Sequence, residues 1–302
     1  MNILSFDVGG SSIKYGVVNK NSEILSKGSA KTPENEKNFL ELINLVIDQS
    51  EVKFNKISVA MPGFVNKKNG VYLYGTNIKY EIDFKKINNF DHSKFVIDND
   101  GNVAAYAEYN LNYKDKITNL IMLTFGTGIG GGIINSGMLV RGVSNAGELG
   151  HILISDKIKN ECNCGKTGCL ESVVSARIWT EECKALALNE PDSDLAKLFI
   201  QKKVGSILFN QEIKLTSNQI AARDNIINYI SRGLVSMFEI FNNELFILGG
   251  AMSAEPYGLI DLVKKNINTQ FEFTARVFPD IRISDFKSDL GIIGAALLAQ
   301  NE

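Results

Sequence analysis

The pattern of apolar and polar positions predicts a chain in which short buried strands and amphipathic helices follow one another. Apolar runs that end at glycine or polar residues predict strands at 2–8, 13–19, 23–31, 56–66, 69–77, 95–97, 244–253 and 276–286. Apolar residues at helical spacing predict helices at 34–50, 102–111, 169–188, 224–242, 261–268 and 290–299, and the polar segment 189–222 is also expected to be mostly helical. Strands and helices that alternate in this way are typical of an α/β fold.

One strand pattern occurs twice. The segments LSFDVGGSSIKYGVVN at 4–19 and MLTFGTGIGGGIIN at 122–135 share a strand with a Phe, a Gly-rich turn and a second strand that ends in Gly-apolar-apolar-Asn. A repeat at the length of a domain suggests two related lobes that face a shared nucleotide. In both copies the glycines lie between two strands, which differs from dinucleotide-binding and Walker loops, where a helix follows.

The first Gly-rich turn has the composition of an anion site. Gly9 and Gly10 allow backbone N–H groups to approach a phosphate closely, Ser11 adds a hydroxyl donor, and Lys14 adds positive charge. Asp7, directly before the turn, could hold a hydrated Mg²⁺ beside phosphates. An ordinary hairpin turn with a capping Asp has the same composition, so these residues alone leave both interpretations open.

Polar residues are concentrated where the strand at 95–97 ends and a helix begins. Asp98, Asn99, Asp100 and Asn102 occupy this junction, and the carboxyl ends of strands are where α/β proteins place ligands. One such residue would be explained by helix N-capping alone. Because the group exceeds what one cap requires, we treat a functional role and a capping role as equally open.

A compact cluster of metal-ligating residues follows in the sequence. His151, Cys162, Cys164 and Cys169 include three of the chain's four cysteines and one of its two histidines. Cys₃His is a set typical of closed, structural zinc sites. A strained Cys162–Cys164 disulfide or a catalytic thiol would be the alternatives. The fourth cysteine, Cys183, lies outside the cluster and is expected to be a small buried apolar residue.

Two carboxylates lie beside the predicted zinc ligands. Glu148 precedes His151, and Glu171 follows Cys169. If zinc fixes the loop, these carboxylates could accept pairs of hydrogen bonds from adjacent sugar hydroxyls, and such a site rejects analogues that lack a hydroxyl.

A pair of glycines, Gly249 and Gly250, ends the apolar strand predicted at 244–253. Backbone without side chains at this point could lie against an adenine or its ribose. A simple strand-to-helix turn is an equally good interpretation of the pair.

Composition narrows the class of protein. The chain has 302 residues, 44% of them hydrophobic, a formal net charge of -2 and a pI of about 5.9. It is long enough for two lobes of roughly 100–200 residues each. We find no basic face for nucleic acid, no apolar span for a membrane and no signal peptide in the sequence. Clustered cysteines favour a reducing, cytoplasmic location.

Together, these motifs resemble the ROK family of sugar kinases and regulators, which have the actin-like ATPase fold. The matching segments are DVGGSSIK at 7–14, ND at 99–100 with Asn102, FGTGIGGG at 125–132, GELGH at 147–151, CNCGKTGCLE at 162–171 and LGG at 248–250. Repressors of the family carry an N-terminal helix-turn-helix, whereas the hairpin begins at residue 3 here, so we expect a kinase.

The resemblance implies a role for each matching residue. Asp100 would be the catalytic base that takes the proton from the sugar 6-hydroxyl, and Asp7 would lie near Mg²⁺. The sets implied are Gly9, Gly10, Thr127 and Gly128 for ATP phosphates, Gly249 and Gly250 for adenosine, and Asn99, Asp100, Glu148, His151 and Glu171 for the sugar. His151 would use one nitrogen for zinc and the other for a sugar hydroxyl.

The prediction is therefore an ATP-dependent hexose kinase with Mg²⁺ and a structural Zn²⁺, and a homodimer is expected from the family. The acceptor would be glucose or a close derivative such as N-acetylmannosamine or a β-glucoside. Fructose is the alternative acceptor. A non-catalytic sugar sensor and a zinc hydrolase are the alternative functions. The predicted small lobe spans 1–115 and regains the helix at 289–302, and the large lobe spans 116–288. Two positions depart from the family pattern: Gly101 replaces an Ala, and Thr76-Asn77 replaces a Pro-Asn pair.

Overall fold

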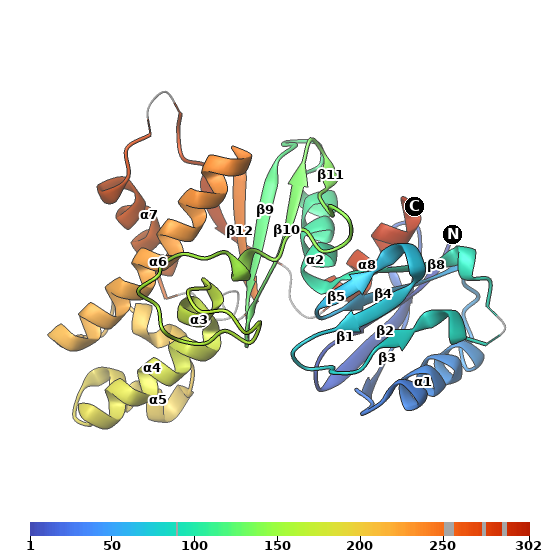
Figure 1. Cartoon of the computed structure of the whole chain (residues 1–302), viewed down its shortest axis with the longest axis horizontal. Coiled ribbons are helices and arrows are strands. Elements are labelled where there is room, and N and C mark those ends of the chain that lie inside the picture. The colour runs from blue at the N-terminus through green and yellow to red at the C-terminus, as the bar shows by residue number, and fades with distance from the viewer. Residues whose placement is uncertain (89, 251–256, 274–275, 286–288) are drawn as a thin grey trace. The chain divides into compact units, whose positions relative to one another are not determined.

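The computed structural model describes residues 1–88, 90–250, 257–273, 276–285 and 289–302 (Figure 1). The chain divides into two compact units. The first unit consists of Met1–Thr118, Gly132–Gly147 and Phe286–Glu302, and the second of Asn119–Gly131 and Glu148–Asp285. Residues 132–147 therefore belong to the first unit, whereas the predicted lobe boundaries place them in the second.

Strands and helices follow one another in groups along the chain. The strands are β1 (Ile3–Val8), β2 (Ser12–Val18), β3 (Ile24–Lys31), β4 (Lys56–Met61), β5 (Phe64–Asn66), β6 (Val71–Tyr74), β7 (Ile82–Asp83), β8 (Phe95–Asn99), β9 (Leu120–Phe125), β10 (Ile129–Asn135), β11 (Met138–Leu139), β12 (Leu245–Gly250) and β13 (Asp280–Ile283). The α-helices are α1 (Glu36–Asp48), α2 (Asp100–Glu108), α3 (Glu171–Val174), α4 (Ala176–Asn189), α5 (Asp194–Lys202), α6 (Ser217–Phe241), α7 (Leu259–Gln270) and α8 (Leu290–Gln300).

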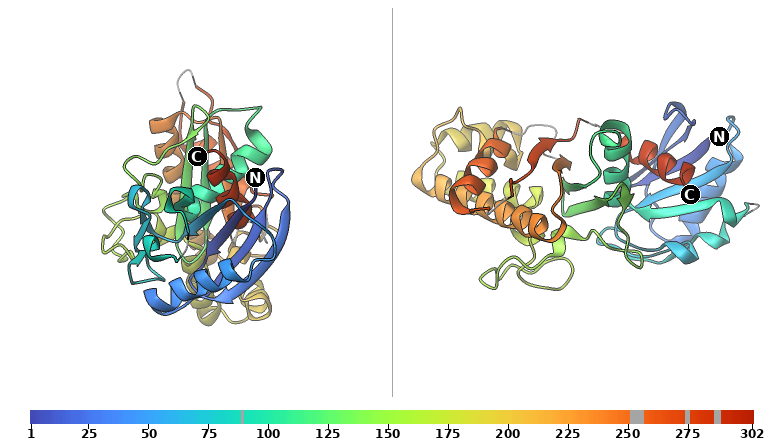
Figure 2. Two further views of the ribbon diagram at one scale, coloured as in Figure 1. Left: turned by 90° about the vertical axis from the view of Figure 1, so that its right-hand side faces the viewer. Right: turned by 90° about the horizontal axis from the view of Figure 1, so that it is seen from above.

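The first unit is built on a mixed sheet with the strand order β3-β2-β1-β4-β8. Side chains of β1 alternate between its two faces. Leu4 and Phe6 lie in one buried cluster with Phe39 of α1, whereas Ile3 packs with Ile292 of α8 on the other face. Figure 2 shows α8 beside the strands of this sheet. The sheet is therefore covered on both faces, as the apolar run of β1 requires.

The second sheet has the order β11-β10-β9-β12-β13. In the first sheet, β1 pairs antiparallel with β2 and parallel with β4. In the second sheet, β10 and β11 are antiparallel, while β9, β12 and β13 are parallel. The two strand orders therefore correspond position by position, and the predicted α/β class is confirmed as a fold with mixed sheets.

Some predicted helices differ from the observed ones. The predicted helix at 169–188 is broken at Ser175, which has extended backbone between α3 and α4. The polar segment 189–222 contains only α5 and the start of α6, with a 3₁₀ turn at Gly205–Phe209 between them. This turn packs closely on α4, because a Cβ at Gly205 would lie 2.3 Å from the backbone of Trp179. Tertiary packing thus overrides local helix propensity here.

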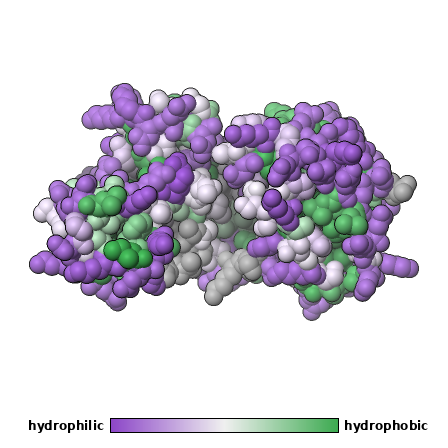
Figure 3. Space-filling view, turned by 90° about the horizontal axis from the view of Figure 1, so that it is seen from below, coloured by the Kyte–Doolittle hydropathy of each residue, from purple (hydrophilic) through white to green (hydrophobic). Residues whose placement is uncertain are grey.

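In the described part of the chain, no helix is long and apolar enough to cross a membrane. The face drawn in Figure 3 is largely hydrophilic, with hydrophobic residues in separate patches.

Candidate functional site

The turn between β1 and β2 is closed by backbone hydrogen bonds. The Gly9 N–H donates to the Ser12 carbonyl at 2.9 Å, and the Thr32 hydroxyl donates to the Gly9 carbonyl at 2.7 Å. A Cβ at Gly10 would lie 2.8 Å from the Asn77 side chain, so only glycine leaves room for Asn77. The turn itself is largely exposed, including the predicted donor Ser11. The turn is therefore exposed to solvent around Gly10 and Ser11, and its predicted phosphate role stays a prediction.

Asp7 lies near the end of β1, opposite Lys14 in the register of β1 and β2. Burial raises the pKa of the Asp7 carboxyl, Lys14 opposes that shift, and Asp289 adds to it. A Cβ at Gly291 of α8 would lie 2.2 Å from Asp7 Cγ. Glycine at the start of α8 thus leaves space for this carboxylate. A partly buried carboxylate is a ligand type that Mg²⁺ accepts, and the predicted role of Asp7 near Mg²⁺ stays a prediction.

The polar residues at the end of β8 have separate roles. Asp98 is buried and accepts from Arg141 Nε at 2.5 Å and from Asn102 Nδ2 at 2.9 Å. Asn99 caps α2, because its Oδ1 accepts from the N–H groups of Gly101 and Asn102 at 2.8 and 3.2 Å. The Asp100 carboxylate stands at the first position of α2, is partly exposed and accepts from the Gly101 N–H at 2.8 Å.

This arrangement separates the two interpretations of the junction. Asp98 and Asn99 use their side chains for structure, an ion pair and a helix cap. Asp100 presents its carboxylate at the N-terminus of α2. Gly101 is buried beneath these side chains and donates to both Asn99 and Asp100.

Sequence reasoning missed Arg141. Besides Asp98, its guanidinium contacts Glu302 at 3.0 Å, and Glu302 also pairs with Lys67. In the same loop, Asn145 accepts from the Val65 N–H at 2.9 Å. The loop after β11 is therefore held to the rest of the first unit. No sequence motif links Asp98 to Arg141. The available signal was a carboxylate directly after an apolar strand, because a carboxylate that becomes buried needs a cation beside it.

The second Gly-rich turn, between β9 and β10, is held at both ends. The Gly126 N–H donates to the Gly128 carbonyl at 2.9 Å, and the Gly126 carbonyl accepts from the Arg177 N–H at 3.3 Å. Glu171 Oε2 accepts from the Ile129 N–H at 2.8 Å. Thr127 is exposed between these two anchors. This turn, too, presents its central residue outward.

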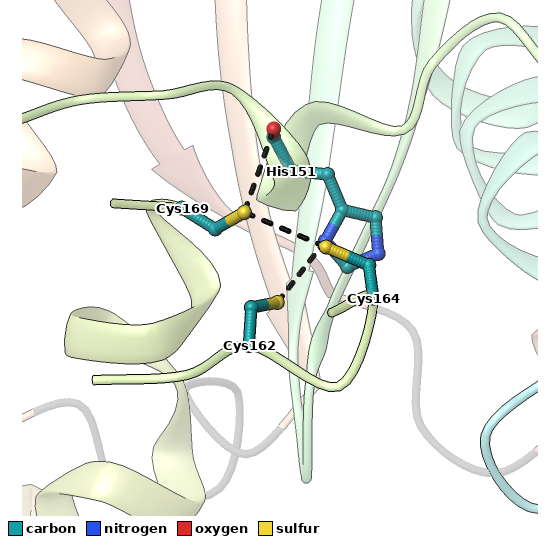
Figure 4. Close-up of side chains that lie close together, drawn as sticks. All are labelled: His151, Cys162, Cys164 and Cys169. Carbon is teal, nitrogen blue, oxygen red and sulfur yellow. Dashed lines mark hydrogen bonds between the residues drawn. The ribbon is translucent and has the colours of Figure 1, made fainter. Parts of the chain in front are cut away.

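The predicted metal ligands come together in the second unit (Figure 4). The four ligand atoms of His151, Cys162, Cys164 and Cys169 all lie within 4.8 Å of one another. Cys162 Sγ is 3.4 Å from His151 Nδ1, and Cys164 Sγ is 3.6 Å from Cys169 Sγ. Ligands of a tetrahedral zinc lie about 3.5–3.8 Å apart, given its usual bond lengths. The donor set and its spacing therefore fit zinc.

The backbone of the loop is shaped for this cluster. Gly165 and Gly168 have φ of +80° and +87°, values that favour glycine. A Cβ at Gly168 would also lie 2.6 Å from the Ser155 carbonyl. Cys183 lies apart, fully buried, with Sγ 3.3 Å from the Gly205 carbonyl. Its predicted role as a small buried residue is confirmed.

The two carboxylates near the cluster differ in their partners. Glu148 Oε2 is 3.9 Å from His151 Nε2, the nitrogen that does not face Cys162. Burial raises the pKa of the Glu148 carboxyl; His151 lowers it and Glu171 adds to the rise. Glu171 is buried, with Oε1 3.4 Å from Cys162 Sγ. The four candidate ligands, Glu148 and Glu171 thus lie close together within the second unit.

The glycine pair ends β12 next to β9. Gly250 has φ of +75°, and a Cβ there would lie 2.4 Å from the Phe125 carbonyl. Gly249 pairs in register with Thr124. The remainder of the predicted strand to residue 253 lies outside the described residues. The pair's predicted contact with adenosine stays a prediction.

The chain is similar to known proteins over its whole length. The family model described as "ROK family" matches residues 3–302. A glucokinase of Halalkalibacterium halodurans is 28% identical over 98% of this chain and 94% of its own length. An N-acetylmannosamine kinase of Escherichia coli is 25% identical over 100% of this chain and 99% of its own.

Among solved structures, a ROK glucokinase from Streptomyces griseus in complex with glucose and AMPPNP is similar. The TM-score is 0.82 and the identity 25%, with all of both chains covered. The family model matches residues 3–302, and the motifs and the mixed sheets agree with it. The chain therefore belongs to the ROK family.

Proposed function

We propose that this protein transfers the γ-phosphoryl group of ATP to the 6-hydroxyl of glucose or a close derivative. The observation that carries the proposal is the division of roles at the end of β8. Asp98 is neutralised by Arg141, Asn99 caps α2, and Asp100 presents a partly exposed carboxylate at the helix N-terminus. A positioned carboxylate of this kind is what a general base for a hydroxyl requires.

In this mechanism, Asp100 accepts the proton of the sugar 6-hydroxyl, and the resulting oxygen attacks the γ-phosphorus in line. Most of the catalysis comes from positioning and charge neutralisation. In this proposal the Gly10 N–H of the first turn and the turn at Thr127-Gly128 donate to phosphate oxygens, and Lys14 adds charge; the Gly9 N–H instead closes the first turn on the Ser12 carbonyl. Asp7 would hold Mg²⁺, which neutralises phosphate charge when bound.

The acceptor sugar is proposed from chemistry and from the relatives. Glu148 and His151 offer donors and acceptors suited to sugar hydroxyls, and Glu171 adds a carboxylate oxygen. The Asn99 side chain caps α2 and donates to the Gly63 carbonyl, so we assign it no sugar contact. The similar proteins include glucokinases and N-acetylmannosamine kinases. Both sugars are aldohexose-based and carry a 6-hydroxyl.

The direct test is ADP release with glucose, N-acetylmannosamine, an alkyl β-glucoside and fructose at equal concentrations. We expect the highest kcat/KM with glucose or one of the two derivatives, and ³¹P NMR of the product should show a 6-phosphate ester. Turnover that is fastest with fructose would contradict the proposed acceptor class. The absence of sugar-dependent ADP release, with sugar still bound, would instead favour the sugar-sensor alternative.

We further propose one structural zinc on His151 Nδ1 and the three cysteines. Zinc would fix the loop that carries Glu148, while His151 Nε2 would face Glu148 and the sugar. Four protein ligands leave no open position for water, which supports a structural role over hydrolysis. The turn at Thr127 is anchored from outside the ligand set, by Arg177 and Glu171.

Loss of zinc should therefore weaken sugar binding more than nucleotide binding. For Cys164→Ser, we expect zinc content to fall from one equivalent to well below it. The Kd for glucose should rise by at least about tenfold, as for disrupted metal environments, and the Kd for AMPPNP should rise less. Metal analysis and calorimetry measure these quantities. Cys183→Ala, a cysteine outside the cluster, is the control, and equal losses of both affinities in Cys164→Ser would refute the expected order.

A further inference from the structure

Glu171 makes a contact with the second Gly-rich turn that its predicted role at the sugar does not explain. Its Oε2 accepts the Ile129 N–H at 2.8 Å, at the point where the second Gly-rich turn enters β10. A Cβ added to Gly128 would lie 2.4 Å from the same oxygen. The carboxylate is therefore in direct contact with the turn, and position 128 has space only for glycine.

The surroundings of Glu171 hold this oxygen in place. The side chain is buried, at 6% exposure, and Glu171 is the first residue of α3. At the other end of the turn, the Arg177 N–H donates to the Gly126 carbonyl. Two residues of the segment 171–177 thus hydrogen-bond to the turn, one at each end, and Thr127 is exposed between these two contacts.

The two oxygens of Glu171 are not equivalent. Oε1 lies 3.4 Å from Cys162 Sγ. Because Oε2 accepts the Ile129 N–H, Oε1 is the oxygen that would accept from a sugar hydroxyl. One side chain could in this way contact the sugar and the phosphate turn together.

We propose that Glu171 is a positioning residue for nucleotide phosphate: its Oε2 fixes the 126–129 turn in the shape that receives the phosphates. This inference rests on the proposed nucleotide role of that turn. We call the hydrogen bond from the Ile129 N–H to Glu171 Oε2 the clamp. The clamp depends on side-chain length and on an accepting oxygen, whereas a sugar contact made by a carboxylate depends on charge.

Three substitutions separate these requirements. Glu171→Gln keeps the length and an oxygen that can accept from Ile129, but loses the charge. Glu171→Asp keeps the charge but is one methylene too short to reach the N–H. Glu171→Ala loses both. Folding of each variant is checked by thermal melting, and if the Ala variant does not fold, the Gln and Asp variants alone still make the comparison.

Calorimetry with Mg²⁺·AMPPNP gives the first readout. We expect Glu171→Asp and Glu171→Ala to raise the nucleotide Kd about tenfold, as for the loss of one charge-assisted hydrogen bond. Glu171→Gln should remain within about threefold of the unsubstituted protein. Glucose affinity should follow the opposite order, with Gln weaker than Asp. Nucleotide Kd values that are unchanged in Asp and Ala, or as weak in Gln as in Ala, would overturn the inference.

Hydrogen exchange at the Ile129 amide gives a second readout that needs neither ligand nor turnover. Protection should be retained in Glu171→Gln and lost in Glu171→Asp and Glu171→Ala. Equal protection in all three variants would refute the clamp. Failure of the proposed kinase function would instead appear in the unsubstituted protein, as no sugar-dependent ADP release, so the two failures are distinguishable.

Discussion

Replacing Asp100 with Asn is expected to lower kcat by about 10²–10⁴-fold, the range for removal of a general base. Asn has nearly the same shape and can still accept from the Gly101 N–H, which Asp100 does at 2.8 Å. It cannot take the proton of the attacking hydroxyl. Because the loss falls on the transition state, the Kd for glucose should change by only a few fold.

Steady-state kinetics and calorimetry on the same preparations make the comparison. Asp115→Asn is the matched control, because Asp115 is an exposed aspartate of the same unit, and its kcat should equal that of the unsubstituted protein. Normal turnover by Asp100→Asn, with glucose bound, would remove Asp100 from the role of base.

The second large effect is expected at the buried ion pair of the first unit. Arg141→Met should lower the free energy of unfolding of this unit by about 3–5 kcal/mol, the cost typical of a buried charge left without its partner. The side chain of Asp98 is only 1% exposed, so water cannot replace the guanidinium. Asn102 would remain as a donor to Asp98, but it carries no charge.

Urea denaturation followed by a probe in the first unit measures this change. Lys27→Met is the control, because Lys27 and Asp289 form a pair in the same unit that is 45% and 32% exposed, and it should cost at most about 1 kcal/mol. Adding Asp98→Asn to Arg141→Met should recover part of the loss, since the stranded charge is then absent. A loss for Arg141→Met no larger than that for Lys27→Met would contradict the role of the pair.

Local patterns predicted much of the fold. The sequence predicts the apolar strand β1, the Gly-rich turn after it and the second copy of this pattern at 122–135. Strand patterns and tight turns are local properties of the chain, so they can be predicted without the tertiary structure. The metal cluster was also predictable, since few residue types bind zinc and they occur here at close spacing.

The partner that each polar side chain contacts in the folded chain could not be predicted from the sequence. At the end of β8, sequence could not say which residue would bind Arg141, because the two positions are far apart in the chain and the contact forms only after folding. The sequence also did not show that Glu171, a predicted sugar contact, accepts the Ile129 N–H with its Oε2. The break at Ser175 and the 3₁₀ turn at Gly205–Phe209 were not predicted either, and the turn lies against Trp179 of α4.

The course of the chain through the first unit has a consequence for biosynthesis. Its central strand, β1, precedes the second unit in the chain, but the face of β1 that carries Ile3 and Asp7 is covered by α8, which follows the second unit. Residues 148–285, most of the second unit, are complete before α8 emerges from the ribosome. Domains generally fold as they are synthesised, so one apolar face of β1 stays open to chaperones until α8 has also emerged.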